Sequence, residues 1–324
     1  MPVARRAGRR IVAAHSFPDA ETVRPMRFHV VLNRDGGTLR GGDPDRLAQR
    51  LGGRLRELGH EVDVAVVAGG EVEAALDQAA KGAFDVVMVG GGDGTVSAAA
   101  ARLAGSDKAL AVLPAGTMNL FARGLGIPLD LDAAVDALGG GTVRAVDVAA
   151  ADGRIFVHQF SVGLHAKLIR LRRNKAFGSR PGKMWASLQA GLAAFLRPPR
   201  LEAVLDIDGR ELSVGTSGIG ITNNLLGEGY RLPYAARPDG GVLGVYITRA
   251  RRRRDLARFL LGAAVGRWKR NAHVDIHEAR EVTLRLVARH SRFGCALDGE
   301  LAELGSVTHL RVMPGALKVV VPAS

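Results

Sequence analysis

The chain has 324 residues, 47% of them hydrophobic, and its 45 lysines and arginines against 32 aspartates and glutamates give a formal net charge of +13. This length favours two domains with separate cores, and the positive charge favours polyanionic partners such as nucleotides or an anionic membrane. Cys295 is the only cysteine, which excludes an intrachain disulfide and a thiolate metal cluster within one chain and fits a cytoplasmic protein. No apolar run of about 18 to 20 residues occurs, which argues against a transmembrane helix.

Residues 1–25 are basic and irregular, and they lack the apolar core of a signal peptide. We expect them to form a disordered leader. From Arg27 onwards, short apolar runs alternate with amphipathic segments. The pattern predicts strands over 27–33, 61–67 and 85–89, a helix capped by Asp43 or Asp45 and ended by Gly59, and a second helix over 72–81. This alternation predicts an α/β domain over 26–145, with a parallel sheet covered by helices on both faces.

A glycine-rich turn directly follows the strand over 85–89. Its sequence, Gly90-Gly91-Gly92-Asp93-Gly94-Thr95, lets backbone N–H groups approach an anion closely. A helix expected to begin at Thr95 points the positive end of its dipole at the same place. The turn therefore predicts a phosphate site, where the carboxylate of Asp93 requires a bound cation or a water network.

A second polar turn, Ala115-Gly116-Thr117-Met118-Asn119, follows the predicted buried strand over 109–114. A helix through Leu120 and Leu125 is expected after it. Because the carboxyl ends of parallel strands meet at one edge of a sheet, we expect the two turns to lie close together, where open α/β folds bind ligands.

Beyond about residue 145 the period changes from that of helices to that of strands. Strands are expected over 154–162, 201–207, 212–222, 242–248, 282–287 and 310–313, with apolar helices over 184–196 and 256–268. Turn pairs such as Asp152-Gly153 and Asp208-Gly209 separate many of the strands. The pattern is typical of an antiparallel, hairpin-rich domain over 146–324.

Five spaced motifs resemble the diacylglycerol kinase catalytic family, which includes sphingosine and ceramide kinases and bacterial lipid kinases. They are the turn after Asn33, the Gly91-Gly92-Asp93-Gly94-Thr95 turn, residues 113–119, residues 125–128, and Leu297-Asp298-Gly299-Glu300. The resemblance implies a nucleotide-binding α/β domain, a C-terminal antiparallel β-sandwich domain that binds the lipid substrate, and an active site in the cleft between them. It leaves open a return of the final strand to the first domain.

The resemblance also implies roles for individual residues. The phosphate loop would comprise Gly91, Gly92, Asp93, Gly94, Thr95, Val96 and Ser97, with further nucleotide contacts from Asn33, Gly116, Thr117 and Asn119. Glu300 would take the proton of the lipid hydroxyl, with Asp298 as a supporting acid or metal ligand and Asp93 as a third catalytic carboxylate. The implied cofactors are ATP and Mg²⁺, and the implied reaction is an in-line attack of an alcohol on the γ-phosphoryl group. Without the other motifs, Asp298-Gly299 would be as readily an ordinary hairpin turn.

Several positions depart from the family's pattern. Leu120 stands where an acidic residue often follows the asparagine of the second motif, Ser97-Ala98 replaces an Asn-Glu pair, and Val66 replaces a threonine. In the loop where bacterial members hold a structural Mg²⁺, the ligand position is Gly240. Asp239 would be the substitute ligand there, and the alternative is an ordinary Pro-Asp-Gly turn. These departures predict a thinner polar network than that of the best-known bacterial lipid kinases.

An arginine cluster, Arg249 with 251–254, precedes the apolar stretch 256–268. It fits peripheral association with an anionic membrane surface, although a solvated helix start would look the same. The predicted function is an ATP-dependent kinase acting on a hydroxyl of diacylglycerol or a related lipid. The alternatives are an NAD kinase-like enzyme, which shares the turn at Asp93, and a nucleotide- or lipid-binding protein with weakened catalysis, suggested by Leu120, Ala98 and Gly240. No aromatic-basic motif supports nucleic-acid binding, and the oligomeric state is left open.

Overall fold

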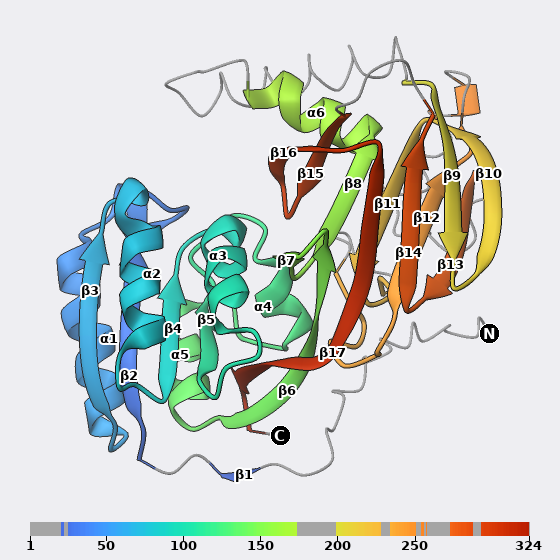
Figure 1. The fold of residues 1–324 in the computed structure, drawn as a ribbon. Coiled ribbons are helices and arrows are strands. Elements are labelled where there is room, and N and C mark those ends of the chain that lie inside the picture. The colour runs from blue at the N-terminus through green and yellow to red at the C-terminus, as the bar shows by residue number, and fades with distance from the viewer. Residues whose placement is uncertain are drawn as a thin grey trace, which may run out of the picture.

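The computed structural model describes residues 21–22, 25–173, 199–227, 234–250, 254–255, 257, 273–287 and 293–323. These residues form an α/β domain and an antiparallel β-sandwich domain, arranged side by side in Figure 1. The helices expected over 184–196 and 256–268, and most of the leader, lie outside the described residues. Within the leader, Glu21–Thr22 forms strand β1, which pairs with Thr142 and Val143 of a later strand.

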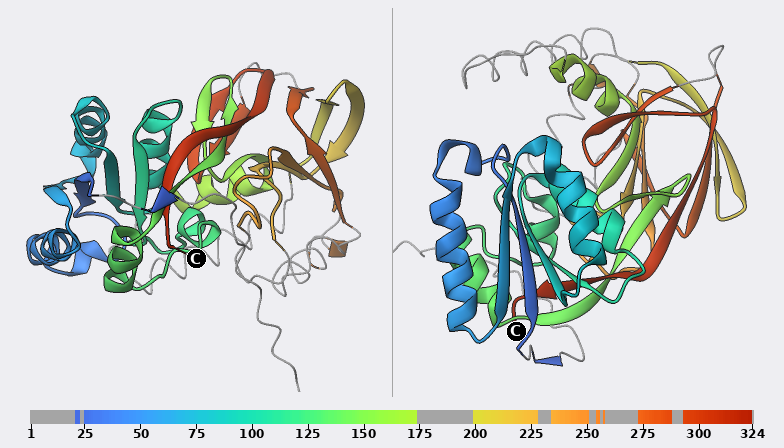
Figure 2. Two further views of the ribbon diagram at one scale, coloured as in Figure 1. Left: turned by 90° about the horizontal axis from the view of Figure 1, so that it is seen from below. Right: turned by 60° about the vertical axis from the view of Figure 1, so that its left-hand side comes forward.

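The first domain is built on four parallel strands in the order β3-β2-β4-β5. The strands are β2 (Arg27–Asn33), β3 (Glu61–Val67), β4 (Val86–Gly90) and β5 (Ala109–Leu113). The helices are α1 (Pro44–Glu57), α2 (Val72–Lys81), α3 (Asp93–Leu103), α4 (Leu120–Gly124) and α5 (Leu131–Gly139), with short 3-10 turns at Leu39–Gly41 and Gly69–Glu71. Helices α1 and α5 pack together on one face of the sheet, and α2 and α3 pack on the other, as Figure 2 shows.

Local sequence explains these elements. Every residue of β4 and β5 is buried, as expected for central parallel strands that are covered on both faces. The side chain of Asp43 accepts a hydrogen bond from the backbone of Arg46 at 3.0 Å, which caps α1, and Pro44 occupies its first turn. Gly59 follows the helix with a φ of 90°, a conformation that favours glycine. The predicted α/β class is therefore confirmed.

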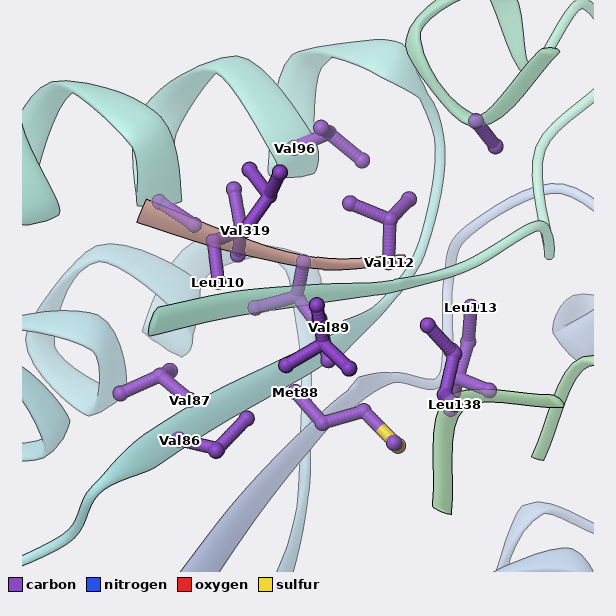
Figure 3. Close-up of a cluster of buried hydrophobic side chains, with 14 of the residues drawn as sticks. Val86, Val87, Met88, Val89, Val96, Leu110, Val112, Leu113, Leu138 and Val319 are labelled. Atoms are coloured by element: carbon purple, nitrogen blue, oxygen red, sulfur yellow. The ribbon is translucent and has the colours of Figure 1, made fainter. Parts of the chain in front are cut away.

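A long ribbon of two antiparallel strands joins the domains. It consists of β6 (Thr142–Ala151) and β17 (Val307–Val321), which pair over most of their length with an irregularity between Met313 and Leu317. At its carboxyl end β17 also pairs in parallel with β5, so that Val319 is fully buried beside Leu110 of β5, on the side of the sheet where Val96 of α3 lies (Figure 3). The last strand thus contributes to the core of the first domain.

The sandwich domain packs two antiparallel sheets face to face. The eleven-stranded sheet continues from β17 through β14 (Glu281–Leu286) and β9 (Leu201–Ile207) to β10 (Arg210–Thr216), and β7 (Arg154–Phe156) pairs with β6. The second sheet has six strands in the order β13-β12-β11-β8-β15-β16. They are β8 (Gln159–Gly163), β11 (Gly218–Asn223), β12 (Leu243–Thr248), β13 (Val274–Ala279), β15 (Phe293–Leu297) and β16 (Glu300–Leu304). Leu205 and Leu284 of the first sheet meet Phe160 and Ile221 of the second in one buried cluster.

Two predicted strands are divided in the structure. The segment expected over 212–222 leaves the first sheet with β10 and enters the second with β11, and the buried Ser217 lies at the change. The segment expected over 154–162 divides into β7 and β8 in the same way, because each half pairs in a different sheet. Helix α6 (Leu164–Arg173) follows β8 and packs against β15 and β16. Within the described part of the chain, none of the helices combines the length and apolar character needed to cross a membrane.

Candidate active site

Three loops meet at the carboxyl edge of the parallel strands, after β2, β4 and β5. The backbone N–H of Thr38 donates to the carbonyl of Ala115 at 2.9 Å, which ties the first loop to the third. A Cβ atom added to Gly116 would lie 2.9 Å from the Cα atom of Gly92, closer than real side chains approach. The glycines are therefore needed because the backbones of the loops touch, and the loops form one surface.

The loop after β4 leads directly into α3, whose N-cap is Gly92. The helix begins at Asp93, two residues earlier than the sequence predicts, so its N-terminal amides lie within the glycine-rich turn. The side chain of Asp93 accepts a hydrogen bond from the backbone N–H of Leu120 at 2.8 Å. One carboxylate thereby joins the start of α3 to the start of α4. Leu120 takes part through its backbone N–H group.

Two asparagines shape the loops around this turn. Asn33 donates from Nδ2 to the hydroxyl of the buried Thr95 at 3.3 Å, and its Oδ1 accepts from the backbone of Asp35. Asn119 adopts a left-handed φ of 51° as the N-cap of α4, and its side chain bonds to the backbone of Pro114 and Gly116. Thr117 lies exposed between these anchors, and Val96 is buried in the core behind the loop.

Opposite the loops stands the hairpin of β15 and β16. Asp298 and Gly299 form its turn with φ angles of 44° and 86°, which is the left-handed pair that a two-residue hairpin needs. The carboxylate of Asp298 accepts three backbone N–H groups, from Val157 (2.8 Å), His158 (2.9 Å) and Gln159 (2.8 Å). It also accepts the hydroxyl of Ser97 at 2.6 Å. With this many donors from the chain, Asp298 has the environment of an anchoring carboxylate.

Glu300 follows the turn and is exposed, unlike Asp298. A Cβ atom added to Gly94 would lie 2.9 Å from Oε1 of Glu300, so the carboxylate rests against the backbone of the glycine-rich turn. Ser97 and Gly94 of the first domain therefore meet Asp298 and Glu300 of the second.

His158 was not predicted as a site residue. It lies between β7 and β8, and its environment includes the carboxylates of both Asp298 and Asp93. Burial lowers the pKa of His158, although the charges of Asp298 and Asp93 act in the opposite direction. Beyond it, a hydrogen bond of 2.7 Å joins the hydroxyl of Ser161 to Nδ1 of His165. The sequence around His158 only continues the strand pattern, so no local signal marks the residue.

The loop expected to hold a structural Mg²⁺ is organised by protein groups. Asp239 accepts a weak hydrogen bond from Arg237 at 3.4 Å. The buried carboxylate of Asp147 holds the loop by accepting the backbone N–H of Gly241 at 2.6 Å and the side-chain amide of Asn224 at 3.0 Å. Among the described residues, no three acidic, histidine or cysteine side chains are grouped to hold a metal. The groups shown to hold this loop are therefore a buried carboxylate and an amide, and the cation at Asp239 stays a prediction.

Only part of the arginine cluster is described. Arg249 donates to Asp275, and Arg254 lies 3.7 Å from Asp255. The remaining arginines of the cluster and the apolar stretch after it lie outside the described residues.

Two family models match successive parts of this chain. Residues 27–151 match the diacylglycerol kinase catalytic domain, and residues 161–321 match the YegS C-terminal NAD kinase beta sandwich-like domain. A protein named probable lipid kinase YegS-like from Pseudomonas aeruginosa (strain UCBPP-PA14) is 31% identical over 275 residues, covering 83% of this chain and 87% of that protein. A diacylglycerol kinase from Bacillus subtilis (strain 168) is 35% identical over 109 residues, covering 32% of this chain and 36% of that protein.

A solved structure shares the fold. The crystal structure of a diacylglycerol kinase from Bacillus anthracis str. Sterne matches 91% of this chain and 96% of its own with a TM-score of 0.70, at 18% sequence identity. The sequence comparisons show the family as well as the fold. The two domain models match one after the other along the chain, and the match to the relative from Pseudomonas aeruginosa covers 87% of that protein. The chain thus belongs to the YegS-like family of lipid kinases, with a diacylglycerol kinase catalytic domain followed by the family's β-sandwich domain.

Proposed function

We propose that this protein transfers the γ-phosphoryl group of ATP to a hydroxyl group of diacylglycerol or a related lipid at a membrane surface. The observation that carries the proposal is the approach of Glu300 to the glycine-rich turn, where its Oε1 would lie 2.9 Å from a Cβ atom at Gly94. A general base must lie within hydrogen-bond reach of the hydroxyl that attacks the phosphorus. Glu300 is an exposed carboxylate of the second domain that lies against this turn.

In this mechanism the phosphates of ATP lie at the N-terminus of α3, where backbone N–H groups and the helix dipole favour negative charge. Mg²⁺ bound with ATP would neutralise charge on the phosphate oxygens. Glu300 takes the proton of the lipid hydroxyl as the new oxygen–phosphorus bond forms and the bond to the leaving ADP oxygen breaks. Asp93 keeps the turn in place through Leu120.

The proposed access of lipid is supported by α6, which packs against the β15–β16 hairpin that carries Glu300 (Figure 1). The sequence of this helix is rich in basic residues and contains Lys167 and Arg170. The side chain of Arg170 lies over Gly294 of β15. With the net charge of +13, a basic helix beside the hairpin that carries Glu300 favours approach to an anionic lipid surface.

The test is phosphoryl transfer from γ-labelled ATP to vesicles of anionic phospholipid that contain diacylglycerol, with ceramide and monoacylglycerol vesicles in parallel. Glu300→Gln should lower transfer at least 100-fold, in the range of a lost general base, while ATP binding persists. Glu303→Gln, on the same strand, is the matched control and should retain activity. Equal transfer by wild type and Glu300→Gln would contradict the assigned role.

The NAD kinase-like alternative is kept because the second domain matches a sandwich described as NAD kinase-like. NAD⁺ should therefore be offered as an acceptor in the same assay. Phosphorylation of NAD⁺ without transfer to any lipid would replace the proposal. Binding of ATP and lipid without transfer to either acceptor would favour the catalytically weakened binding protein.

A further inference from the structure

We infer that Ser97 is a positioning residue that locks the hairpin carrying Glu300 onto the helix that carries the phosphate loop. The inference rests on the proposed function and adds a residue to it. Ser97 lies on α3, one turn after Asp93 and Gly94. Its hydroxyl donates to Asp298 at 2.6 Å, and Asp298 lies two residues before Glu300.

Three Asp-Gly turns of the chain share one backbone conformation, and one of them bonds to Ser97. Asp152-Gly153, Asp208-Gly209 and Asp298-Gly299 all adopt the same left-handed pair of conformations. In the first two, the aspartate accepts hydrogen bonds from backbone N–H groups of a neighbouring strand, His309 for Asp152 and Arg280 with Glu281 for Asp208. Asp298 accepts backbone N–H groups in the same way and, in addition, the hydroxyl of Ser97 from the other domain. The three turns therefore share the hydrogen bonds from backbone N–H groups, and Asp298 differs from the other two aspartates by its bond to Ser97 of α3.

Two contacts then join the hairpin to α3. The hydroxyl of Ser97 holds Asp298, and the carboxylate of Glu300 rests against Gly94. The hydrogen bond to a carboxylate is short and charge-assisted, so it is among the stronger polar contacts. Because the three backbone N–H groups keep Asp298 in its turn without Ser97, removal of the hydroxyl should loosen the hairpin relative to α3 without unfolding it.

The experiment compares Ser97→Ala and Ser97→Thr with Ser106→Ala. The hydroxyl of Ser106, just beyond the other end of α3, bonds only locally to the carbonyl of Leu103 and the N–H of Lys108, so this variant is the matched control. Ser97→Ala should lower kcat roughly 10- to 100-fold, the range controlled by a hydrogen bond to a charged group. The KM for ATP should stay within about twofold of the wild-type value. A fall in kcat without a change in KM indicates the loss of an interaction that is made only in the transition state. Ser97→Thr, which keeps the hydroxyl, should recover most of the activity.

A double-variant cycle tests whether the two side chains act together. Asp298→Asn should lower kcat, and Ser97→Ala added to it should cause little further loss, since the same contact is already weakened. Asp208→Asn, at the equivalent turn, should leave kcat unchanged. Multiplicative losses in the double variant, or an unchanged kcat in Ser97→Ala, would overturn the inference.

A second measurement does not depend on turnover. Amide hydrogen exchange in peptides covering 293–304 should become faster in Ser97→Ala and remain at the wild-type rate in Ser106→Ala, with similar thermal midpoints for both. If the wild type transfers phosphate to no lipid, the proposed function fails, while the exchange comparison still decides whether Ser97 holds the hairpin. Unchanged exchange in Ser97→Ala would show that it does not.

Discussion

At the scale of single residues, the site depends on how closely backbones and carboxylates approach one another. The sequence predicts the Asp298-Gly299 turn from its residue types. It does not reveal that Asp298 accepts N–H groups from residues 157–159 and the hydroxyl of Ser97, because those partners are about 140 and 201 positions away. His158 has no sequence signal for the same reason. Its neighbours Asp93 and Asp298 come from two separate parts of the chain.

Gly94→Ala tests the approach of Glu300. The added methyl group would meet Oε1 at 2.9 Å, and the flexible, exposed glutamate would move away while the fold is retained. We expect kcat to fall about tenfold or more, with a thermal midpoint close to that of the wild type. Gly53→Ala, on α1 with nothing within 4 Å, is the control and should keep full activity with slightly greater stability. Wild-type kcat in Gly94→Ala would show that Glu300 is not held at this position for the reaction.

His158 should make stability fall in mild acid. Because burial lowers its folded pKa below the ordinary value of 6.5, the unfolded chain binds the proton first as the pH falls. The contribution of neutral His158 to the free energy of unfolding is therefore fully present above about pH 6.5 and is lost progressively below that pH. Thermal midpoints measured between about pH 5 and 7.5 should drop less in His158→Gln than in the wild type. His309→Gln, at an exposed position, should follow the wild-type curve, and identical curves for all three proteins would count against this assignment.

At the scale of elements, the periodicity of apolar residues is sufficient to predict the bounds of strands that stay in one sheet. The strands over 27–33 and 61–67 have the predicted bounds, as does the helix over 72–81. It fails where a strand changes sheets at Ser217, since an alternating pattern persists through the change and only the pairing partners differ. The loop at 237–241 is a similar case, because the group that holds it, Asp147, lies on β6, far away in the sequence.

Asp147 should be worth more to stability than any cation at this loop. Its carboxylate is 3% exposed and accepts N–H groups from Gly241 and Gly315 as well as the amide of Asn224. Asp147→Ala removes the acceptor of all three donors and leaves the amide of the buried Asn224 without it, and we expect a loss of roughly 3 kcal/mol in the free energy of unfolding. Asp239→Ala should cost less than about 0.5 kcal/mol, as for a surface pair. Denaturant unfolding of the nucleotide-free protein should be the same with EDTA and with Mg²⁺, and a large stabilisation by Mg²⁺ that Asp239→Ala abolishes would contradict this account.

At the scale of the whole molecule, the two domains share one sheet. The change of period near residue 145 predicts two architectures, and the predicted fold class is confirmed. Because β6 and β17 continue through both halves, the change of period marks a change in strand partners within a continuous sheet. The pairing of β17 with β5 joins residues more than 200 positions apart, which local patterns do not encode.

Removal of the last strand should therefore damage the first domain. A chain that ends at residue 305 loses Val319 and Val320, both fully buried, and leaves one side of β5 without its partner. We expect it to lack cooperative thermal unfolding by circular dichroism, including the helical signal of the first domain. Truncation of residues 1–20 is the control and should leave the unfolding transition intact. A cooperative transition in the shortened chain would show that the first domain folds without β17.

The ribbon of β6 and β17 also limits how this enzyme can move. In the described part of the chain, the backbone passes from one half to the other within two strands that are hydrogen-bonded to each other, so neither of these crossings is a free linker. A motion that opened the two halves would have to break hydrogen bonds of this ribbon, so we expect the frame to keep its shape while ligands bind. Such a scaffold would keep the distance between the glycine-rich turn and Glu300 nearly constant from one turnover to the next.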